Sequence, residues 1–283
     1  LTAGGDVQLH GVYWSVWGWG DRGTMWLIDW GFNPRYEGAE IDTEDESDDD
    51  GGRRIEGGDI ANDIRALDDT VIDRVFRIEG TNPLGESVMQ VRICNIDTNF
   101  RTREVQEYVR LREPNPSVCV TGKRDRVRTV RGKNTRMKER FKMSNVEKPQ
   151  TGGDDYRGGM QLWEIDGYQV KEDLFERLTF SYETIGSIRF YTGIIRDGED
   201  FLKQFCNERP AERPNQRTGR PERFWMVQSK SIGNHLWDTG VYARAAADME
   251  LHRKRLNWDA SQWSPKTTYV SHDSDVNDSE EVR

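Results

Sequence analysis

The sequence predicts an α/β fold in which a mixed β-sheet is flanked by helices, and three observations lead to this prediction. Three short runs of apolar or alternating residues, separated by glycine-containing breaks, open the chain as an antiparallel meander would. A β-branched run, a helical pattern and a second β-branched run follow within about 30 residues, which is typical of a parallel βαβ unit. A long helical pattern closes the folded part of the chain.

The first half of the chain contains the meander, a polar insertion and a helix. The three strands are expected over residues 1–8, 11–17 and 24–29. The acidic and glycine-rich residues 37–58 are expected to form a long loop. Asp59 is a good N-cap, and apolar residues recur after it at three- and four-residue steps, so a helix of about four to five turns is expected. This apolar stripe consists of Ile60, Ile64, Leu67, Val71, Ile72 and Val75.

The second half supplies the parallel part of the sheet, with a strand over 91–97, a helix over 98–112 and a strand over 117–121. Residues 122–159 are polar and basic, with few core residues, and are interpreted as an extended basic arm or hairpin. The later elements are expected as a strand at 162–165, a helix at 171–178, strands at 187–191 and 224–228, and a helix at 235–256. Three strands, helix, strand, helix, strand is the layout of the ribonuclease H-like fold. One such domain is therefore predicted over residues 1–256, followed by a flexible acidic tail at 257–283.

Composition and motifs argue against several classes of protein. No apolar run approaches the roughly 20 residues needed to span a bilayer, and the start of the chain lacks a signal-peptide pattern, so a soluble intracellular protein is expected. The cysteines Cys94, Cys119 and Cys206 are odd in number and far apart, which argues against a disulfide framework or a zinc site. No phosphate-binding loop motif is present, so neither an ATPase motor nor a bound nucleotide is expected here. The abrupt apolar start at Leu1 suggests a missing upstream segment.

The net charge of −9 argues against nucleic acid binding only until the distribution of charge is considered. Acidic residues gather in 37–50 and again in the tail after His272, whereas the stretch 123–142 holds ten basic residues against Asp125 and Glu139 alone. A local patch of this density can attract a polyanion whatever the net charge, so a DNA-contacting role is predicted. The predicted DNA-binding residues, called the basic island below, are Lys123, Arg124, Arg126, Arg128, Arg131, Lys133, Arg136, Lys138, Arg140 and Lys142. A solvated surface stretch is the alternative.

Three aspartates occupy unusual places in the predicted elements. Asp6 lies inside the first strand, Asp97 ends the fourth strand, and Asp238 lies in the first turn of the last helix. Groups at the carboxyl ends of strands line the ligand crevice in open α/β sheets, so all three acids can meet at one rim. Taken singly, Asp97 is also explained as a turn former and Asp238 as an acid that complements the helix dipole. Asp6 is the hardest of the three to explain structurally.

Clustered carboxylates repel one another by about 1 kcal/mol per pair in water, and such clusters persist when cations neutralise them. Oxygen ligands without Cys or His select hard ions such as Mg²⁺ or Mn²⁺. Two such ions form the usual clamp for attack of water on a phosphodiester, so the predicted catalytic and metal-binding residues are Asp6, Asp97 and Asp238. Asp29 and Asp155 are possible additional ligands, while the four histidines lack metal-ligand spacing and are expected to be structural or surface residues.

Four segments also resemble a known family. The opening LTAGGDVQLHGVYWSVWGWGDRGTMWLIDWG resembles the start of the nuclease domain of lambda-type phage terminase large subunits, and VRICNIDTNFRTREVQEYVR is similar to the family's second acidic segment. LWEIDGYQVKEDLFERL resembles the segment where a Lys opens a helix, and IGNHLWDTGVYARAAA resembles the family's closing helix. One departure is visible, because His235 stands where the family usually has Glu.

This resemblance implies a ribonuclease H-like endonuclease that cuts double-stranded viral DNA by two-metal hydrolysis during genome packaging, with Asp6, Asp97 and Asp238 as ligands. It also implies an upstream ATPase domain, a small terminase subunit and a portal as partners, in the host cell cytoplasm. Two alternatives stay open at this point. One is another ribonuclease H-like nuclease, of the transposase or resolvase type, and the other is a catalytically silent module that binds DNA or docks on the portal.

Overall fold

The computed structural model describes residues 1–9, 11–33, 60–78, 86–112, 126–146, 160–191, 193, 199–258 and 268–270. It begins with the predicted antiparallel meander, formed by β1 (Thr2–Gln8), β2 (Gly11–Trp19) and β3 (Met25–Asn33), with the short 3-10 turn η1 (Asp21–Gly23) before β3. The predicted loop at 37–58 lies outside the described residues.

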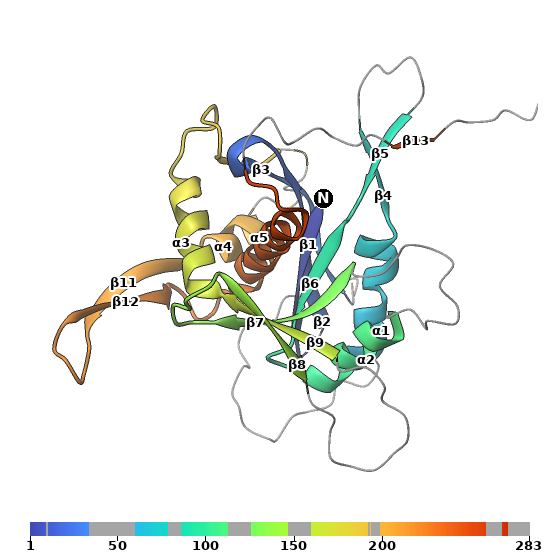
Figure 1. The fold of residues 1–283 in the computed structure, drawn as a ribbon. Helices are drawn as coiled ribbons and strands as arrows, with labels where there is room; N and C mark the ends of the chain where they lie inside the picture. The colour runs from blue at the N-terminus through green and yellow to red at the C-terminus, as the bar shows by residue number, and fades with distance from the viewer. Residues whose placement is uncertain are drawn as a thin grey trace, which may run out of the picture.

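The central sheet has the strand order β10-β3-β2-β1-β6-β7-β9-β8 (Figure 1). The strands β6 (Ile93–Asp97), β7 (Val127–Lys133) and β9 (Met160–Asp166) follow one another in parallel from β1. At the two edges lie β8 (Phe141–Val146), antiparallel to β9, and β10 (Ile188–Arg189), parallel to β3. Because β1 and β6 are parallel neighbours, Asp6 and Asp97 end up at the same rim of the sheet.

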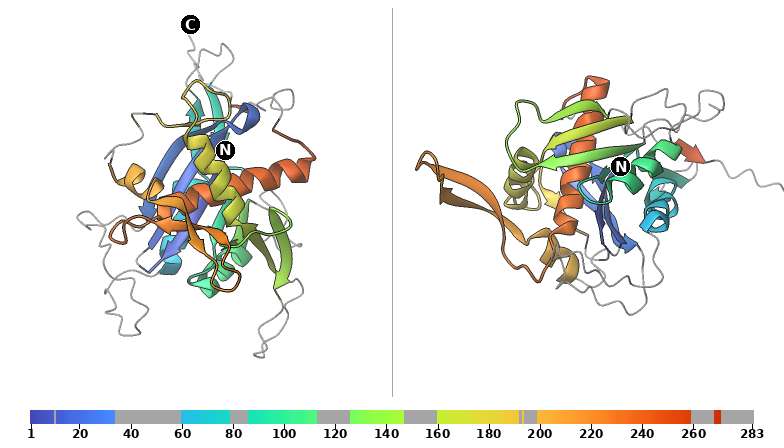
Figure 2. Two further views of the ribbon diagram at one scale, coloured as in Figure 1. Left: turned by 90° about the vertical axis from the view of Figure 1, so that its left-hand side faces the viewer. Right: turned by 90° about the horizontal axis from the view of Figure 1, so that it is seen from below.

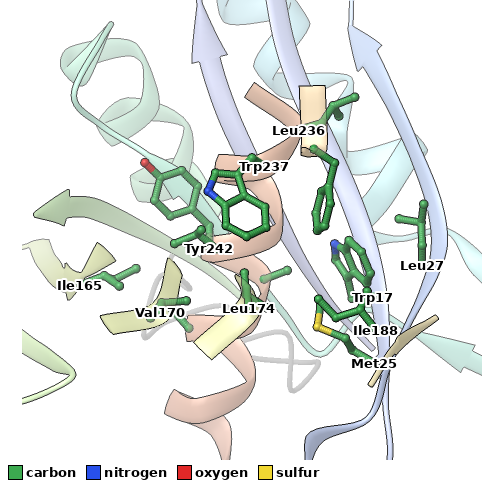
Figure 3. Packing of buried hydrophobic residues seen from close by; sticks show 14 of the residues in the cluster. Trp17, Met25, Leu27, Ile165, Val170, Leu174, Ile188, Leu236, Trp237 and Tyr242 are labelled. Carbon is green, nitrogen blue, oxygen red and sulfur yellow. The ribbon is translucent and has the colours of Figure 1, made fainter. Parts of the chain in front are cut away.

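Helices cover both faces of this sheet. On one side lie α3 (Gly167–Leu178), α4 (Glu199–Phe205) and α5 (His235–Lys254), and on the other lie α1 (Ile60–Arg65) and α2 (Thr102–Arg112) (Figure 1). Trp17, Leu174 and Trp237 belong to the core on the α5 side, shown close by in Figure 3, whereas Val16 belongs to the core under α1 and α2. Val16 and Trp17 thus pack into the cores on opposite faces of the sheet, because side chains alternate along a strand.

α5 packs unusually close to β1. A Cβ atom at Gly4 would lie 2.0 Å from the backbone oxygen of Thr239, so only glycine permits this approach. Deeper in the same contact, the Ser15 and Thr239 hydroxyls are 2.7 Å apart. This packing fixes the first turns of α5, including Asp238, against the strand that carries Asp6.

The helix predicted after Asp59 is confirmed as far as Ile72, with Ile64, Leu67 and Val71 buried, and is wrong only in its last turn. α1 ends at Arg65, a π-helical turn η2 (Asp68–Ile72) follows, and Val75 opens β4 (Val75–Ile78). β4 pairs with β5 (Glu86–Gln90), and β13 (Thr268–Val270) pairs with the other edge of β5. β-Branched residues favour this pairing over a continued helix. Part of the predicted flexible tail is therefore a strand.

The prediction of an extended arm or hairpin at 122–159 is wrong over its described residues, 126–146, which are not paired with each other. They form β7 and β8 of the central sheet, and the buried side chains of Thr129 and Val130 are inserted between the basic residues. β7 lies between β6 and β9 in the sheet, so these two consecutive side chains point to opposite faces and both are covered. β7 is the strand that follows α2 in parallel with β6, whereas the predicted strand at 117–121 lies outside the described residues.

A second, two-stranded sheet projects from the body beside α3 and α4 (Figure 1, Figure 2). It consists of β11 (Glu208–Pro214) and β12 (Pro221–Val227), and is called the hairpin below. The sequence analysis predicted only a strand at 224–228 in this region. None of the described helices has the length and apolar character required to cross a membrane.

Candidate active site at one rim of the central sheet

Asp6, Asp97 and Asp238 line a single pocket of about 290 Å³, as the sequence predicted. The pocket opens where β1, β6 and β7 end and where α3 and α5 begin. Its full lining is Asp6, Gln8, Asp97, Asn99, Gly132, Asn134, Gly167, Lys171, Glu208, Asn234, His235, Asp238, Val241 and Tyr242. Four acidic side chains thus share the pocket with one lysine.

Asp6 is 4% exposed and is held through one oxygen. Its Oδ2 lies 2.9 Å from Nδ1 of His235 and accepts a 2.8 Å hydrogen bond from Nε2 of Gln8. The His235 ring is itself stacked on Tyr13, with ring centroids 4.7 Å apart. Burial raises the pKa of Asp6, and the contact with His235 opposes part of that rise. His235, which was expected to be a structural or surface residue, therefore lines the pocket and contacts one of the predicted ligands.

Asp97 is 5% exposed at the end of β6. Burial raises its pKa to about 7, with a further contribution from the charge of Asp6, while a hydrogen bond from the Asn99 backbone and one from the Tyr242 hydroxyl act in the opposite direction. Its Oδ1 is buried and has no hydrogen-bond partner among the described residues. An orphaned carboxylate oxygen in an acidic pocket is costly unless a cation joins it.

Asp238 lies in the first turn of α5 and is tied to a lysine that the sequence analysis did not select. Lys171 Nζ lies 2.9 Å from Oδ1 of Asp238 and 2.5 Å from Oε2 of Glu208. Asn234 donates 3.0 Å to the other oxygen of Asp238. Burial favours the neutral form of Lys171, but the charges of Asp238 and Glu208 outweigh it and raise the pKa of the ammonium.

The donor set fits a hard divalent cation, since the acidic ligands offer only oxygen and Asp97 Oδ1 is unsatisfied. Within the described part of the chain, however, no three His, Cys, Asp or Glu side chains are arranged so that they could jointly hold a metal ion. Asp238 is instead neutralised by Lys171. Residues of the pocket would therefore have to shift to bind an ion with all three aspartates.

The two additional candidate ligands do not join the pocket. Asp29 accepts a 2.6 Å hydrogen bond from Arg74 and a second from the backbone of Trp30, and it is absent from the pocket lining. It lies within β3, which β2 and β1 separate from β6, and this keeps it away from Asp97. Asp155 lies outside the described residues.

The basic island contributes no side chain to the pocket, although Gly132 and Asn134 from the same segment do. Several of its members pair with acids of the chain: Arg126 with Asp73, Lys133 with Glu164, Arg136 with Glu172, and Arg140 with Asp173 and Asp248. The guanidinium of Arg128 lies over the ring of Trp163, and Lys138 and Lys142 are exposed. Lys123 and Arg124 lie outside the described residues.

The sequence pattern of α3 could have identified Lys171. Lys171 lies three residues from both Tyr168 and Leu174, which are buried, so it occupies the apolar stripe of the helix. A charged residue on an apolar stripe requires a buried partner. Glu208 had no such signal, because only the long-range packing of the hairpin against α3 brings it to Lys171.

Comparison with known proteins identifies the family. The sequence matches the family described as terminase large subunit gpA, endonuclease domain, over residues 1–258. No curated protein and no solved structure matches significantly. The family match covers the meander, the pocket and all of α5. The chain therefore belongs to the family of terminase large subunit gpA endonuclease domains, nucleases of phage DNA packaging.

Proposed function

We propose that this chain is a metal-dependent endonuclease that hydrolyses double-stranded viral DNA during genome packaging, with Asp6, Asp97 and Asp238 as the metal ligands. One observation carries the proposal. Acids from three distant parts of the chain converge in one buried pocket, where Asp97 keeps an orphaned oxygen and a pKa of about 7. The repulsion within such a cluster destabilises the folded chain unless a bound cation neutralises it. Clusters of this kind are typical of functional sites.

The strand order supports a ribonuclease H-like fold as part of this proposal. The segment β3-β2-β1-β6-β7 contains a three-stranded meander followed by two strands parallel to its first member. This is the layout expected from the sequence. The family match favours the terminase alternative over a transposase or a junction resolvase.

Each pocket residue has a proposed task around the ions. His235 and Gln8 hold Asp6 through Oδ2, so that Oδ1 stays available as a ligand. Tyr242 orients Asp97, and Lys171 orients Asp238. Bound Mg²⁺ or Mn²⁺, two ions in all, would activate the attacking water and stabilise the leaving oxygen. The Lys171 ammonium is placed to attract the phosphate of the substrate into an otherwise acidic pocket.

We also propose that Lys138 and Lys142, the exposed members of the basic island that form no ion pair among the described residues, contact DNA phosphates. An upstream ATPase domain, a small terminase subunit and the portal are the proposed partners, and the host cytoplasm is the proposed compartment.

Nicking of supercoiled plasmid in Mn²⁺, Mg²⁺ or EDTA tests the proposal. The natural chain should cut in Mn²⁺ or Mg²⁺ and not in EDTA, and Asp6→Asn and Asp97→Asn should each remove cutting while the fold is retained. Asp29→Asn is the matched control, because Asp29 is a buried strand aspartate outside the pocket. Cutting that survives in both pocket variants would refute the assignment. Plasmid binding without cutting in any metal would favour the silent DNA-binding module, in which Lys171 permanently neutralises Asp238.

A further inference from the structure

The hairpin is rigidly mounted on the two helices that carry pocket residues. Trp225 of β12 packs against Trp237 of α5 at 6.1 Å and against Phe175 of α3 at 5.9 Å between ring centroids. At its root, the side chain of Asn207 donates a 2.8 Å hydrogen bond to the backbone oxygen of Ser229. Glu208, the first residue of β11, reaches into the pocket and pairs with Lys171. The hairpin therefore has a fixed position relative to the pocket.

The outer part of the hairpin is unusually basic for this acidic chain. Of its five arginines, Arg223 pairs with Glu212 at 3.0 Å. The other four are exposed and have no acidic partner among the described residues: Arg209, Arg213, Arg217 and Arg220. The guanidinium of Arg213 lies 4.6 Å from the ring centroid of Phe224, which holds it in place without neutralising it.

The arrangement of these arginines follows the geometry of the hairpin. Arg209 and Arg213 are four residues apart on β11, so their side chains lie on the same face. Glu208 and Trp225 lie on the other face of the hairpin. Arg217 and Arg220 belong to the connecting turn, which is closed by a 2.8 Å hydrogen bond from the Asn215 N–H to the Arg220 carbonyl oxygen. Arg209 and Arg213 therefore share one face of the hairpin, where Glu222 lies opposite Arg213, and Arg217 and Arg220 extend the positive charge around its tip.

We propose that the hairpin is a finger that binds the phosphate backbone of duplex DNA and aligns the duplex with the pocket. This inference rests on the proposed function. The seven residues of β11 extend about 23 Å, and a duplex carries one negative charge per about 1.7 Å of its axis, so all four arginines can face phosphates. Arginine forks bind phosphate oxygens in pairs. None of the four stabilises the described fold through an ion pair, so their charge is available to a ligand.

The test measures binding of a fluorescent 30-base-pair duplex in EDTA by anisotropy, between 50 and 200 mM salt. We compare the natural chain with the variant R209Q/R213Q/R217Q/R220Q. Each phosphate contact contributes about 0.9 to the slope of log affinity against log salt, so the slope should fall by about 3 to 4. Affinity at 100 mM salt should fall at least about 100-fold. An unchanged slope and affinity would overturn the proposal.

A control variant removes charge elsewhere. The variant R253Q/K254Q changes residues at the far end of α5, roughly 23 Å along the helix from Asp238, and should leave the slope within about 1 of the natural value. A fall as large as that of the hairpin variant would show that net charge alone drives binding, and would also overturn the proposal. Because the four hairpin arginines are exposed, their variant should keep its melting temperature in EDTA.

Metal binding separates this proposal from the function on which it rests. The Mn²⁺-induced rise in melting temperature should persist in the hairpin variant and disappear in Asp97→Asn. If Mn²⁺ never stabilises the natural chain while the hairpin variant still loses DNA, the proposed metal site fails and the finger stands. If Mn²⁺ binding is normal and DNA binding is unchanged in the hairpin variant, the finger fails and the metal site stands.

Discussion

α5 carries two clusters of charged side chains that differ in their balance. At its start, Asp238 shares a pocket with three other acids and only Lys171 as a cation. Two turns later, the fully buried Arg244 pairs with Asp173 and Asp248, at 3.2 and 3.4 Å. Arg140 and Arg177 complete this second cluster, which we call the arginine cluster.

The two clusters differ in whether cations of the chain balance their acids. In the arginine cluster each acid has at least one guanidinium within 3.5 Å, and the ring of Trp258 lies 4.3 Å from the Arg244 guanidinium. Its charges are balanced within the chain, so it serves stability, although Arg244 Nη1 and Asp248 Oδ2 make no hydrogen bond among the described residues. The pocket instead has an excess of acid, so a cation from outside the chain would complete it. Substitutions in the pocket and in the arginine cluster should therefore have different effects on cutting and on stability.

The largest contrast is expected from Asp97→Asn. Plasmid cutting in Mn²⁺ should fall at least about 1000-fold, equivalent to about 4 kcal/mol of transition-state stabilisation. The same change should raise the free energy of unfolding in EDTA by on the order of 2 kcal/mol, because it removes a buried charge that Asp6 repels. Denaturant unfolding and a nicking assay measure the two effects. Loss of both activity and stability would mean that Asp97 is a structural residue.

Arg244→Met should have the opposite effect on stability. It removes the central guanidinium of the arginine cluster and leaves Asp173 and Asp248 in a buried setting with fewer partners, so the free energy of unfolding should fall by about 3 kcal/mol. Thermal denaturation checks this. Cutting at a temperature where the variant is folded should be within a fewfold of normal, because no member of the arginine cluster lines the pocket.

The two clusters should also respond oppositely to pH in EDTA. The folded-state pKa of Asp97 is raised from 3.8 to about 7, so its destabilising effect is absent below pH 4 and grows as the pH rises toward 7. The pKa of Asp173 is lowered, since Arg244, Arg177 and Arg140 outweigh the effect of its burial. Its stabilisation is present above pH 4 and is lost as the pH falls further.

Melting temperatures between pH 3 and pH 8 measure this difference. Stability should therefore decline from pH 4 to pH 7, and Asp97→Asn should flatten that decline. Asp173→Asn should instead reduce the acid-induced loss below pH 4. A decline that persists unchanged in Asp97→Asn would assign the titration to another group.

The sequence predicted the central part of the fold because its signals are local. Apolar alternation in β1 and β2, the β-branched run of β6 and the long apolar pattern of α5 all fix elements without reference to distant partners. Prediction failed where tertiary pairing decides. β7 was hidden in the basic island because its arginines alternate with a few buried residues. β4 was missed, and its first residue Val75 was assigned to a helix, because its partner β5 is needed to define it.

The same difference between local signals and tertiary packing explains which pocket residues the sequence analysis selected. The three aspartates were predictable because an acid at a strand end or in a helix start has a recognisable position. Lys171, Glu208 and His235 were not selected, because their roles depend on which elements pack together. The charge density of the basic island was a weak guide, because several of its side chains are neutralised by acids from distant segments.

The smallest effect is expected at Asp29, which sequence reasoning offered as a possible fourth ligand. It is as buried as the pocket aspartates, but its partner is Arg74, whose side chain is 39% exposed. Partly exposed ion pairs contribute little, so Asp29→Asn should lower the free energy of unfolding by at most about 1 kcal/mol. Cutting and the Mn²⁺-induced stabilisation should both be unchanged. Reduced Mn²⁺ binding in calorimetric titration would instead place Asp29 in the metal site. Burial would then outweigh charge balance as a guide to which aspartates of this domain hold the ions.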